Sequence, residues 1–194
     1  ALRQPLEDGE VTVVRGQHMV VFPTRLMLVA ATNPCPCGFA GVDDRCRCGE
    51  ADLRRHRRRL SGPLLDRMDL LVGVRRPSEH DLSSPPVTTS AQARDRVAAA
   101  RERQHRRLAG SRARCNAEVD AGLAERAIRL DESAQRVLGR AYTKGTLSAR
   151  GRHRVARVAQ TLADLQDRDE VRGEDVLTAL SLRQRSSGEE ELAA

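Results

Sequence analysis

The chain has 194 residues, of which 39% are apolar and only 2% aromatic, and its 34 basic and 27 acidic residues give a net charge of +7. This length suits one large domain or two small ones, with a core of aliphatic side chains. No run of 18 apolar residues occurs, which excludes a membrane span, and no signal peptide is expected. Five cysteines without an export signal therefore predict a reducing, cytoplasmic location, where clustered thiols more often bind metal than form disulfides.

The single lysine restricts the nucleotide chemistry of the chain. A P-loop requires Gly-Lys-[Ser/Thr], because the lysine ammonium reaches the terminal phosphates of the nucleotide. Lys144 follows Thr143 and not a glycine, so these 194 residues contain no P-loop.

The first 75 residues alternate short β-rich runs with Gly and Pro. Two Val-rich runs, 10–14 and 19–22, flank Arg15-Gly16-Gln17-His18 and predict a β-hairpin with a basic tip. The apolar runs 26–31 and 68–74 predict two strands buried in a parallel sheet. A very basic helix is expected between these strands, over residues 52–59.

The remainder of the chain has a different composition. Residues 76–90 are rich in Pro and Ser and predict a linker. Helix-forming residues over 91–108, and apolar side chains at helical spacing after Ser148, predict a helical domain over 91–186. Residues 187–194 are expected to form a disordered acidic tail. The fold class is therefore α/β over residues 1–75, followed by an all-α domain.

Four stretches carry a family resemblance: LRQPLEDGEV from Leu2, ATNPCPCG from Ala31, LSGPLLDR from Leu60 and LSARG from Leu147. In family order, and over nearly the whole chain, they resemble the magnesium-chelatase-like AAA+ ATPases of the YifB/ComM type. The resemblance implies the C-terminal portion of an AAA+ αβα core, with a presensor hairpin, two buried parallel strands and a cysteine-rich insertion, plus a helical lid domain. The Walker A and Walker B motifs would precede this portion, so the chain alone is expected not to bind or hydrolyse ATP.

The resemblance also implies a function for the full protein. It would form a homo-hexameric ring, use ATP with Mg²⁺ and act on DNA independently of sequence, in branch migration or as a helicase in recombination or natural transformation. One alternative is a protein-remodelling, chelatase-type ATPase subunit, although the porphyrin-dedicated subunits lack the cysteine set. Another is a non-enzymatic, zinc-bearing DNA-binding module, so enzymatic activity of this chain stays open.

Three residues match nucleotide-contacting positions of the family. Asn33, after the first apolar run, resembles the sensor 1 residue, whose neutral amide can hold the attacking water; the alternative is an Asn-Pro turn that only ends a strand. Arg67 resembles an arginine finger that reaches the neighbouring subunit's nucleotide; the alternative is a surface ion pair. Arg150 matches the sensor 2 arginine. If Ser148 caps the following helix, Arg150 opposes the helix dipole unless an anion lies there, and a solvated arginine is the alternative.

Four cysteines form a pattern that favours metal. Cys35 and Cys37 are followed by Gly38, and Cys46 and Cys48 by Gly49. Four thiolates suit tetrahedral zinc in a closed structural site, with glycine allowing a tight turn after each pair. The usual spacing is Cys-x-x-Cys, so free thiols, a disulfide pair and an iron–sulfur cluster remain alternatives.

Two basic features are candidate DNA contacts. Arg15, with His18 nearby, would form the tip of a hairpin similar to the presensor 1 hairpin that replicative MCM helicases direct into their channel; the alternative is an ordinary exposed arginine. Arg54, Arg55 and Arg58 belong to the basic run, which could instead be a solvated helix face. With so few aromatic residues, base stacking is not expected, and binding would be electrostatic.

Overall fold

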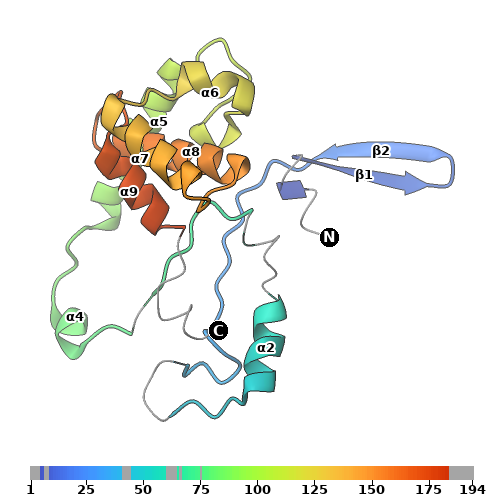
Figure 1. Ribbon diagram of the computed structural model, residues 1–194, viewed down its shortest axis with the longest axis vertical. Helices are drawn as coiled ribbons and strands as arrows, with labels where there is room; N and C mark the ends of the chain where they lie inside the picture. Colours follow the sequence, from blue (N-terminus) through green and yellow to red (C-terminus); the bar gives the residue numbers. More distant parts are fainter. Residues whose placement is uncertain are drawn as a thin grey trace. The chain divides into compact units, whose positions relative to one another are not determined.

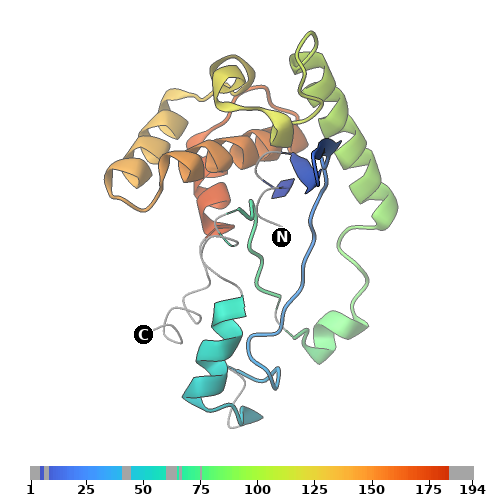
Figure 2. The same cartoon turned by 90° about the vertical axis from the view of Figure 1, so that its right-hand side faces the viewer.

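The computed structural model describes residues 5–6, 9–40, 45–59, 65, 67–74 and 76–183. The chain divides into two compact units, Ala1–Met68 and Asp69–Ala194. The first unit contains strands β1 (Glu10–Arg15) and β2 (His18–Pro23) and helix α2 (Glu50–Arg59) (Figures 1 and 2). The second contains α4 (Glu79–Ser83), α5 (Ser90–Arg107), the 3-10 helix η2 (Asn116–Glu118), α6 (Ala121–Ala127), α7 (Glu132–Thr143), α8 (Ala149–Leu165) and α9 (Gly173–Ser181). An α/β class followed by a helical region is confirmed.

The predicted hairpin forms with the expected register. β1 and β2 are antiparallel, and Arg15 pairs with His18 across the turn (Figure 1). Gly16 has a φ of +62°, which a two-residue hairpin turn favours at this position. The apolar side chains of both strands are largely exposed, with Val14 at 67% and Met19 at 69%. The hairpin is therefore a ribbon without a core of its own.

The two apolar runs differ from the prediction of buried parallel strands. Among the described residues the sheet has only β1 and β2, and no strand forms over 26–31 or 68–74. Leu26, Met27 and Val29 are at least half exposed, as are Leu70 and Val72. A strand of a parallel sheet must pair with neighbouring strands, and the described part of the chain supplies none for these two runs.

The helical unit contains the hydrophobic core. Helix α8 packs against α5, α7, α9 and η2, and the buried apolar side chains include Leu138, Val155, Ala159 and Val176. Val158 and Leu162 pack partly buried against this core, so the predicted apolar face of α8 is confirmed. Aliphatic side chains alone fill this core, as the shortage of aromatic residues requires.

Capping residues set the beginnings of these helices. Thr89 accepts the N–H of Gln92 at α5, and the side chain of Gln92 accepts the N–H of Thr89 in return. The side chain of Asp131 accepts the N–H of Ala134 at the beginning of α7, and the side chain of Ser148 accepts the N–H of Gly151 at the beginning of α8. Such side chains satisfy backbone donors that the first helical turn leaves unpaired.

A short segment after the first unit is attached to the helical unit. The N–H of Leu71 donates to the carbonyl of Leu182 at 2.7 Å. Arg157, on α8, donates to Asp69 Oδ1 at 3.2 Å and to the carbonyl of Ala117 at 2.5 Å. Burial lowers the pKa of Arg157, and the Asp69 carboxylate opposes this shift. Residues 69–71 thus belong structurally to the helical unit.

The segment predicted as a linker, 76–90, carries the short helix α4. A capping box between Ser78 and Asp81 stabilises the beginning of this helix. Residues 187–194, predicted as a tail, lie outside the described residues. No helix in the described ranges combines the length and apolar character needed to cross a membrane.

Candidate functional site

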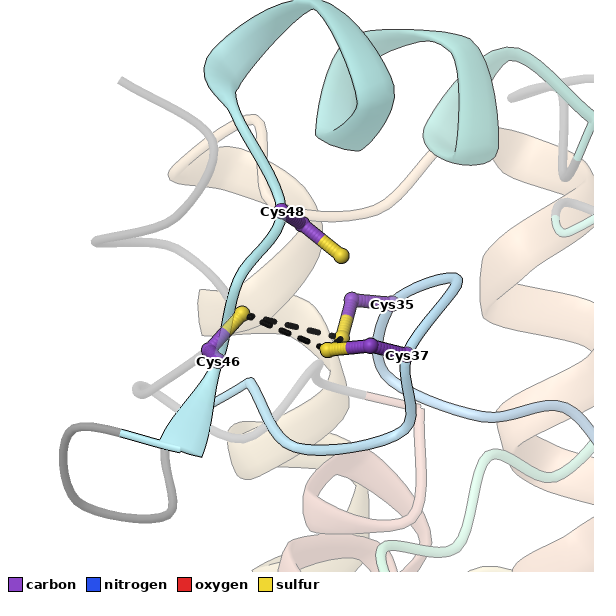
Figure 3. A group of neighbouring side chains, drawn as sticks. All are labelled: Cys35, Cys37, Cys46 and Cys48. Carbon is purple, nitrogen blue, oxygen red and sulfur yellow. Dashed lines mark hydrogen bonds between the residues drawn. The ribbon is translucent and has the colours of Figure 1, made fainter.

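The four cysteines of the two pairs come together in the first unit. Their Sγ atoms all lie within 4.8 Å of one another. Cys35 and Cys37 are 3.3 Å apart, and Cys46 is 3.9 Å from Cys35 and 3.7 Å from Cys37. In Figure 3, Cys46 and Cys48 lie on one segment, and the side chain of Cys48 points toward the turn that carries Cys35 and Cys37. We refer to these four residues as the cysteine cluster.

The geometry of the cluster fits a single tetrahedral metal ion. Zinc–sulfur bonds of about 2.3 Å place the ligand sulfurs of a tetrahedron about 3.8 Å apart, close to the distances from Cys46. The backbone N–H of Ala40 also donates to Cys35 Sγ at 3.2 Å and helps to hold this sulfur in place. The cluster can therefore hold a metal ion.

The thiols differ in their tendency to ionise. Hydrogen bonds from the backbone N–H groups of Phe39 and Arg47 lower the pKa of Cys37 to about 6. A backbone hydrogen bond from Cys37 lowers the pKa of Cys48, but burial and the neighbouring thiols outweigh it and raise that pKa to about 12. The pKa of Cys46 is raised as well, by burial and by the neighbouring thiols, because negative charges held close together repel. A bound cation would remove this repulsion.

Asn33 lies beside the cysteine cluster. It is exposed, and its backbone carbonyl accepts a hydrogen bond from His56 Nε2 at 2.8 Å. Its carboxamide lies over Gly38: a Cβ at that glycine would be 3.8 Å from Asn33 Nδ2. The structure therefore brings Asn33 and the four predicted ligands together.

The two predicted arginines lie in different units. Arg67 is half-buried in the first unit, and its neighbour Asp66, with residues 60–64 of the same motif, lies outside the described residues. Arg150 is exposed in the first turn of α8, in the second unit. The side chain of Ser148 caps this helix by accepting the N–H of Gly151 at 3.0 Å. The predicted cap and the predicted position of Arg150 are confirmed.

The predicted basic residues of the first unit are accessible. Arg15 and His18 are exposed at the end of the hairpin, and Arg54, Arg55 and Arg58 are exposed on α2. Arg54 forms an i,i+4 ion pair with Glu50. Arg55 and Arg58 lie three residues apart, on one side of the helix.

The sequence reasoning did not identify His56 as a contact of Asn33. Leu53, His56 and Arg57 are the less exposed residues of α2 between Asp52 and Arg59. Leu53 is the only large apolar residue of this helix, and residue 56 follows it by three positions on the same face. That spacing was the available signal that His56 points toward the protein.

The amino-acid sequence matches two protein-family models. Residues 1–82 match the model described as magnesium chelatase, subunit ChlI, and residues 87–183 match the model of the ChlI C-terminal region. Together the two matches cover both structural units.

Curated relatives align with almost the whole chain. An uncharacterized protein of Mycobacterium tuberculosis is 44% identical over 95% of this chain and 36% of its own length. Competence protein ComM of Haemophilus influenzae is 38% identical over 94% of the chain and 35% of its own. The uncharacterized protein YifB of Escherichia coli is 36% identical over 94% of the chain and 36% of its own. The chain thus spans about a third of the length of these relatives.

Proposed function

Because the chain belongs to the magnesium chelatase subunit ChlI family, we propose that it is the C-terminal part of an ATP-driven motor. The complete motor is a homo-hexameric cytoplasmic ring that acts on DNA, in branch migration or as a helicase in recombination or natural transformation. A relative at 38% identity is named a competence protein, which supports DNA as the substrate.

The observation that carries the ATP part of this proposal is the N-terminus of α8. Arg150 is exposed there, and the first turn contains no acidic residue. A cation in the first turn opposes the helix dipole, whereas the free N–H groups and the dipole attract an anion. Arg150 accordingly binds nucleotide phosphate as the sensor 2 residue, with Mg²⁺ and the P-loop supplied by the Walker-containing part of the motor.

Two further residues take family roles in the proposal. Asn33 orients the attacking water as sensor 1, because its amide can accept and donate hydrogen bonds without adding charge. Arg67 reaches the nucleotide of a neighbouring subunit and stabilises charge on the transferred phosphoryl group; such arginine fingers raise rates by ~10³–10⁵.

We propose that the ion of the cysteine cluster is zinc. Four thiolates with no additional ligand form a closed site, in which the metal is structural and has no open position for substrate. Zinc would hold together two cysteine pairs separated in the sequence, at Cys35 and Cys37 and at Cys46 and Cys48.

The DNA part of the proposal rests on exposed basic side chains. Arg15 at the hairpin tip and Arg55 and Arg58 on α2 are accessible to a phosphate backbone. Arginine makes bidentate hydrogen bonds to phosphate oxygens and keeps its charge at all physiological pH values. Such contacts give affinity without reading sequence.

A protein substrate is the second candidate, and the exposed apolar side chains of the hairpin favour it. Val14, Met19 and Phe22 are each at least half exposed. Apolar surface of this kind suits a protein partner better than a phosphate backbone. The motor would then remodel a protein, as a chelatase-type subunit.

Salt dependence distinguishes the two candidates. Fluorescence anisotropy with a labelled mixed-sequence DNA duplex is expected to give a Kd of ~10⁻⁴–10⁻⁶ M near physiological salt. The affinity should decrease steeply as salt rises and should be equal for duplexes of different sequence. Binding that is unchanged between 50 and 300 mM salt, or absent at both, would favour the protein-remodelling motor.

A further inference from the structure

We infer that the cysteine cluster positions Asn33 when it holds its metal ion, and that His56 is the positioning residue that makes this link. The inference rests on the proposed function, in which Asn33 contacts the attacking water. It adds a purpose for the metal: the ion fixes a nucleotide-sensing residue.

The first cysteine pair lies on a turn beside the side chain of Asn33. Asn33 precedes Cys35 by two residues, and the N–H of Gly38 donates to the carbonyl of Cys35 at 3.0 Å to close a tight turn. Gly38 has a φ of +83°, and a Cβ added there would lie 3.8 Å from Asn33 Nδ2 and 3.9 Å from Asn33 Cγ. The turn that carries two of the thiols therefore lies next to the carboxamide of Asn33.

The second cysteine pair holds the backbone of Asn33 through α2. This helix begins at Glu50, two residues after Cys48, and the N–H of Leu53 donates to the carbonyl of Gly49 at 3.1 Å. Near the other end of α2, His56 Nε2 lies 2.8 Å from the carbonyl oxygen of Asn33. Since a carbonyl can only accept, Nε2 carries the proton in this bond.

A metal ion closes a ring through these contacts. The ring runs from Asn33 to Cys35, through the metal to Cys48, along α2 to His56 and back through the hydrogen bond. Without the metal, the hydrogen bond between Asn33 and His56 closes a loop of 23 residues. With the metal bound, the loop contains only the 2 residue steps from Asn33 to Cys35 and the 8 from Cys48 to His56. Loop-closure scaling with the 3/2 power of length makes the bond roughly three- to fourfold more populated from this shortening alone.

Rigidity of the connecting elements increases the effect. Helix α2 is a single helix of 10 residues, and a helix does not sample the open conformations of a flexible loop of equal length. The metal therefore controls the conformation of Asn33 without contacting it.

NMR relaxation on the 194-residue chain tests this inference. With one zinc bound, the ¹⁵N order parameters of the Asn33 backbone and side-chain amides should be about 0.85, and in the metal-free chain below about 0.6. His56→Ala should retain zinc and still lower both order parameters, whereas His56→Gln, which can donate a hydrogen bond, should restore them in part.

A matched control isolates the role of His56. His153 on α8 makes the same kind of bond, with Nε2 2.9 Å from the carbonyl of Val119. His153→Ala should therefore leave the order parameters of Asn33 unchanged. Order parameters of Asn33 that stay high in zinc-loaded His56→Ala, or in the metal-free chain, would overturn the inference.

A second measurement separates this inference from the proposed function. ATP hydrolysis would be measured in a chain that also carries the Walker A and Walker B part, with and without Asn33→Ala. If zinc removal makes Asn33 mobile but Asn33→Ala leaves hydrolysis intact, the sensor role fails and the positioning holds. If Asn33→Ala abolishes hydrolysis while Asn33 stays rigid without zinc and in His56→Ala, the positioning fails and the sensor role holds.

Discussion

The guanidinium of Arg107 donates to both carboxylate oxygens of Asp164, at 2.7 and 2.8 Å, although 57 residues separate them in the chain. The Asp164 side chain is fully buried, and that of Arg107 is 11% exposed. Asn116 joins the pair by accepting from Arg107 at 2.9 Å and donating to Asp164 at 2.8 Å. This network connects the end of α5, the 3-10 helix η2 and the end of α8.

Removing one partner of this pair should strongly destabilise the helical unit. Asp164→Ala leaves the Arg107 charge buried without its carboxylate, which should lower the free energy of unfolding by about 3–5 kcal/mol. Urea denaturation followed by circular dichroism measures this change. Arg136→Ala, which removes the exposed partner of Glu132 in the same unit, is the control and should cost less than about 0.5 kcal/mol. Equal losses in the two variants would contradict the assigned role.

The metal content of the cluster gives the second prediction. Chain purified under reducing conditions should contain about one zinc per molecule, and Cys48→Ser should lose it, because three thiolates leave the tetrahedron incomplete. Chelation should loosen the segment around Asn33 and α2 while the helical unit stays folded. Cys115→Ser, which alters the one cysteine outside the cluster, should retain the metal. Elemental analysis that finds no metal and titratable thiols at all four positions would reject zinc.

Charge removal on α2 gives the third prediction. Replacing Arg54, Arg55 and Arg58 with alanine should reduce the slope of log K against log salt by about 2.7, if each arginine neutralises one DNA phosphate. A matched variant replaces three exposed arginines of α5, Arg94, Arg96 and Arg106, and removes the same net charge. DNA binding reduced equally in both variants would show that only net charge matters.

The hairpin tip gives the fourth prediction. In the proposed ring, Arg15→Ala should impair strand movement on DNA and leave basal ATP hydrolysis largely intact, because the proposal assigns this residue to DNA and not to the nucleotide. A strand-displacement assay alongside phosphate release measures both quantities. Loss of both activities together would instead indicate that the substitution disturbs the nucleotide site.

Acid conditions give the fifth prediction. Hydrogen bonds from Ser133 Oγ and the N–H of Ala134 lower the pKa of Asp131 below its ordinary value. A lowered pKa in the folded state means that the stabilisation is complete above the unfolded value of about 3.9 and is lost as pH decreases through the folded value. Asp131→Asn can still cap α7 but cannot titrate, so its stability should depend less on pH between about 5 and 2. The free energy of unfolding would be measured at each pH by denaturation. Plots of this free energy against pH that run parallel for the two proteins would refute the prediction.

The local elements of the fold could be predicted from sequence. The hairpin around Gly16, the basic helix and the cap at Ser148 each depend on residues close together in the chain, and local propensity is sufficient for them. The cysteine cluster could be predicted as a candidate metal site as well, because clustered thiols in a reducing compartment more often bind metal than form disulfides.

Features that depend on distant partners could not be predicted. The apolar runs 26–31 and 68–74 have the composition of buried strands, but pairing requires neighbours that composition does not reveal. The Arg107–Asp164 pair and the His56–Asn33 bond join residues 57 and 23 positions apart. No local pattern distinguishes Arg107 from the many other arginines of the chain. The spacing of His56 from Leu53 indicates which face of α2 carries the histidine, but it does not reveal Asn33 as its partner.

The attachment of residues 69–71 to the helical unit determines where the chain can pivot. Asp69 is bound to Arg157 on α8, and Leu71 to the residue that follows α9. Any hinge between the two units must therefore lie before Asp69, and not in the Pro-rich segment that begins at Arg76. A rotation of α8 would therefore carry Asp69 with it, because Arg157 on that helix holds the Asp69 carboxylate.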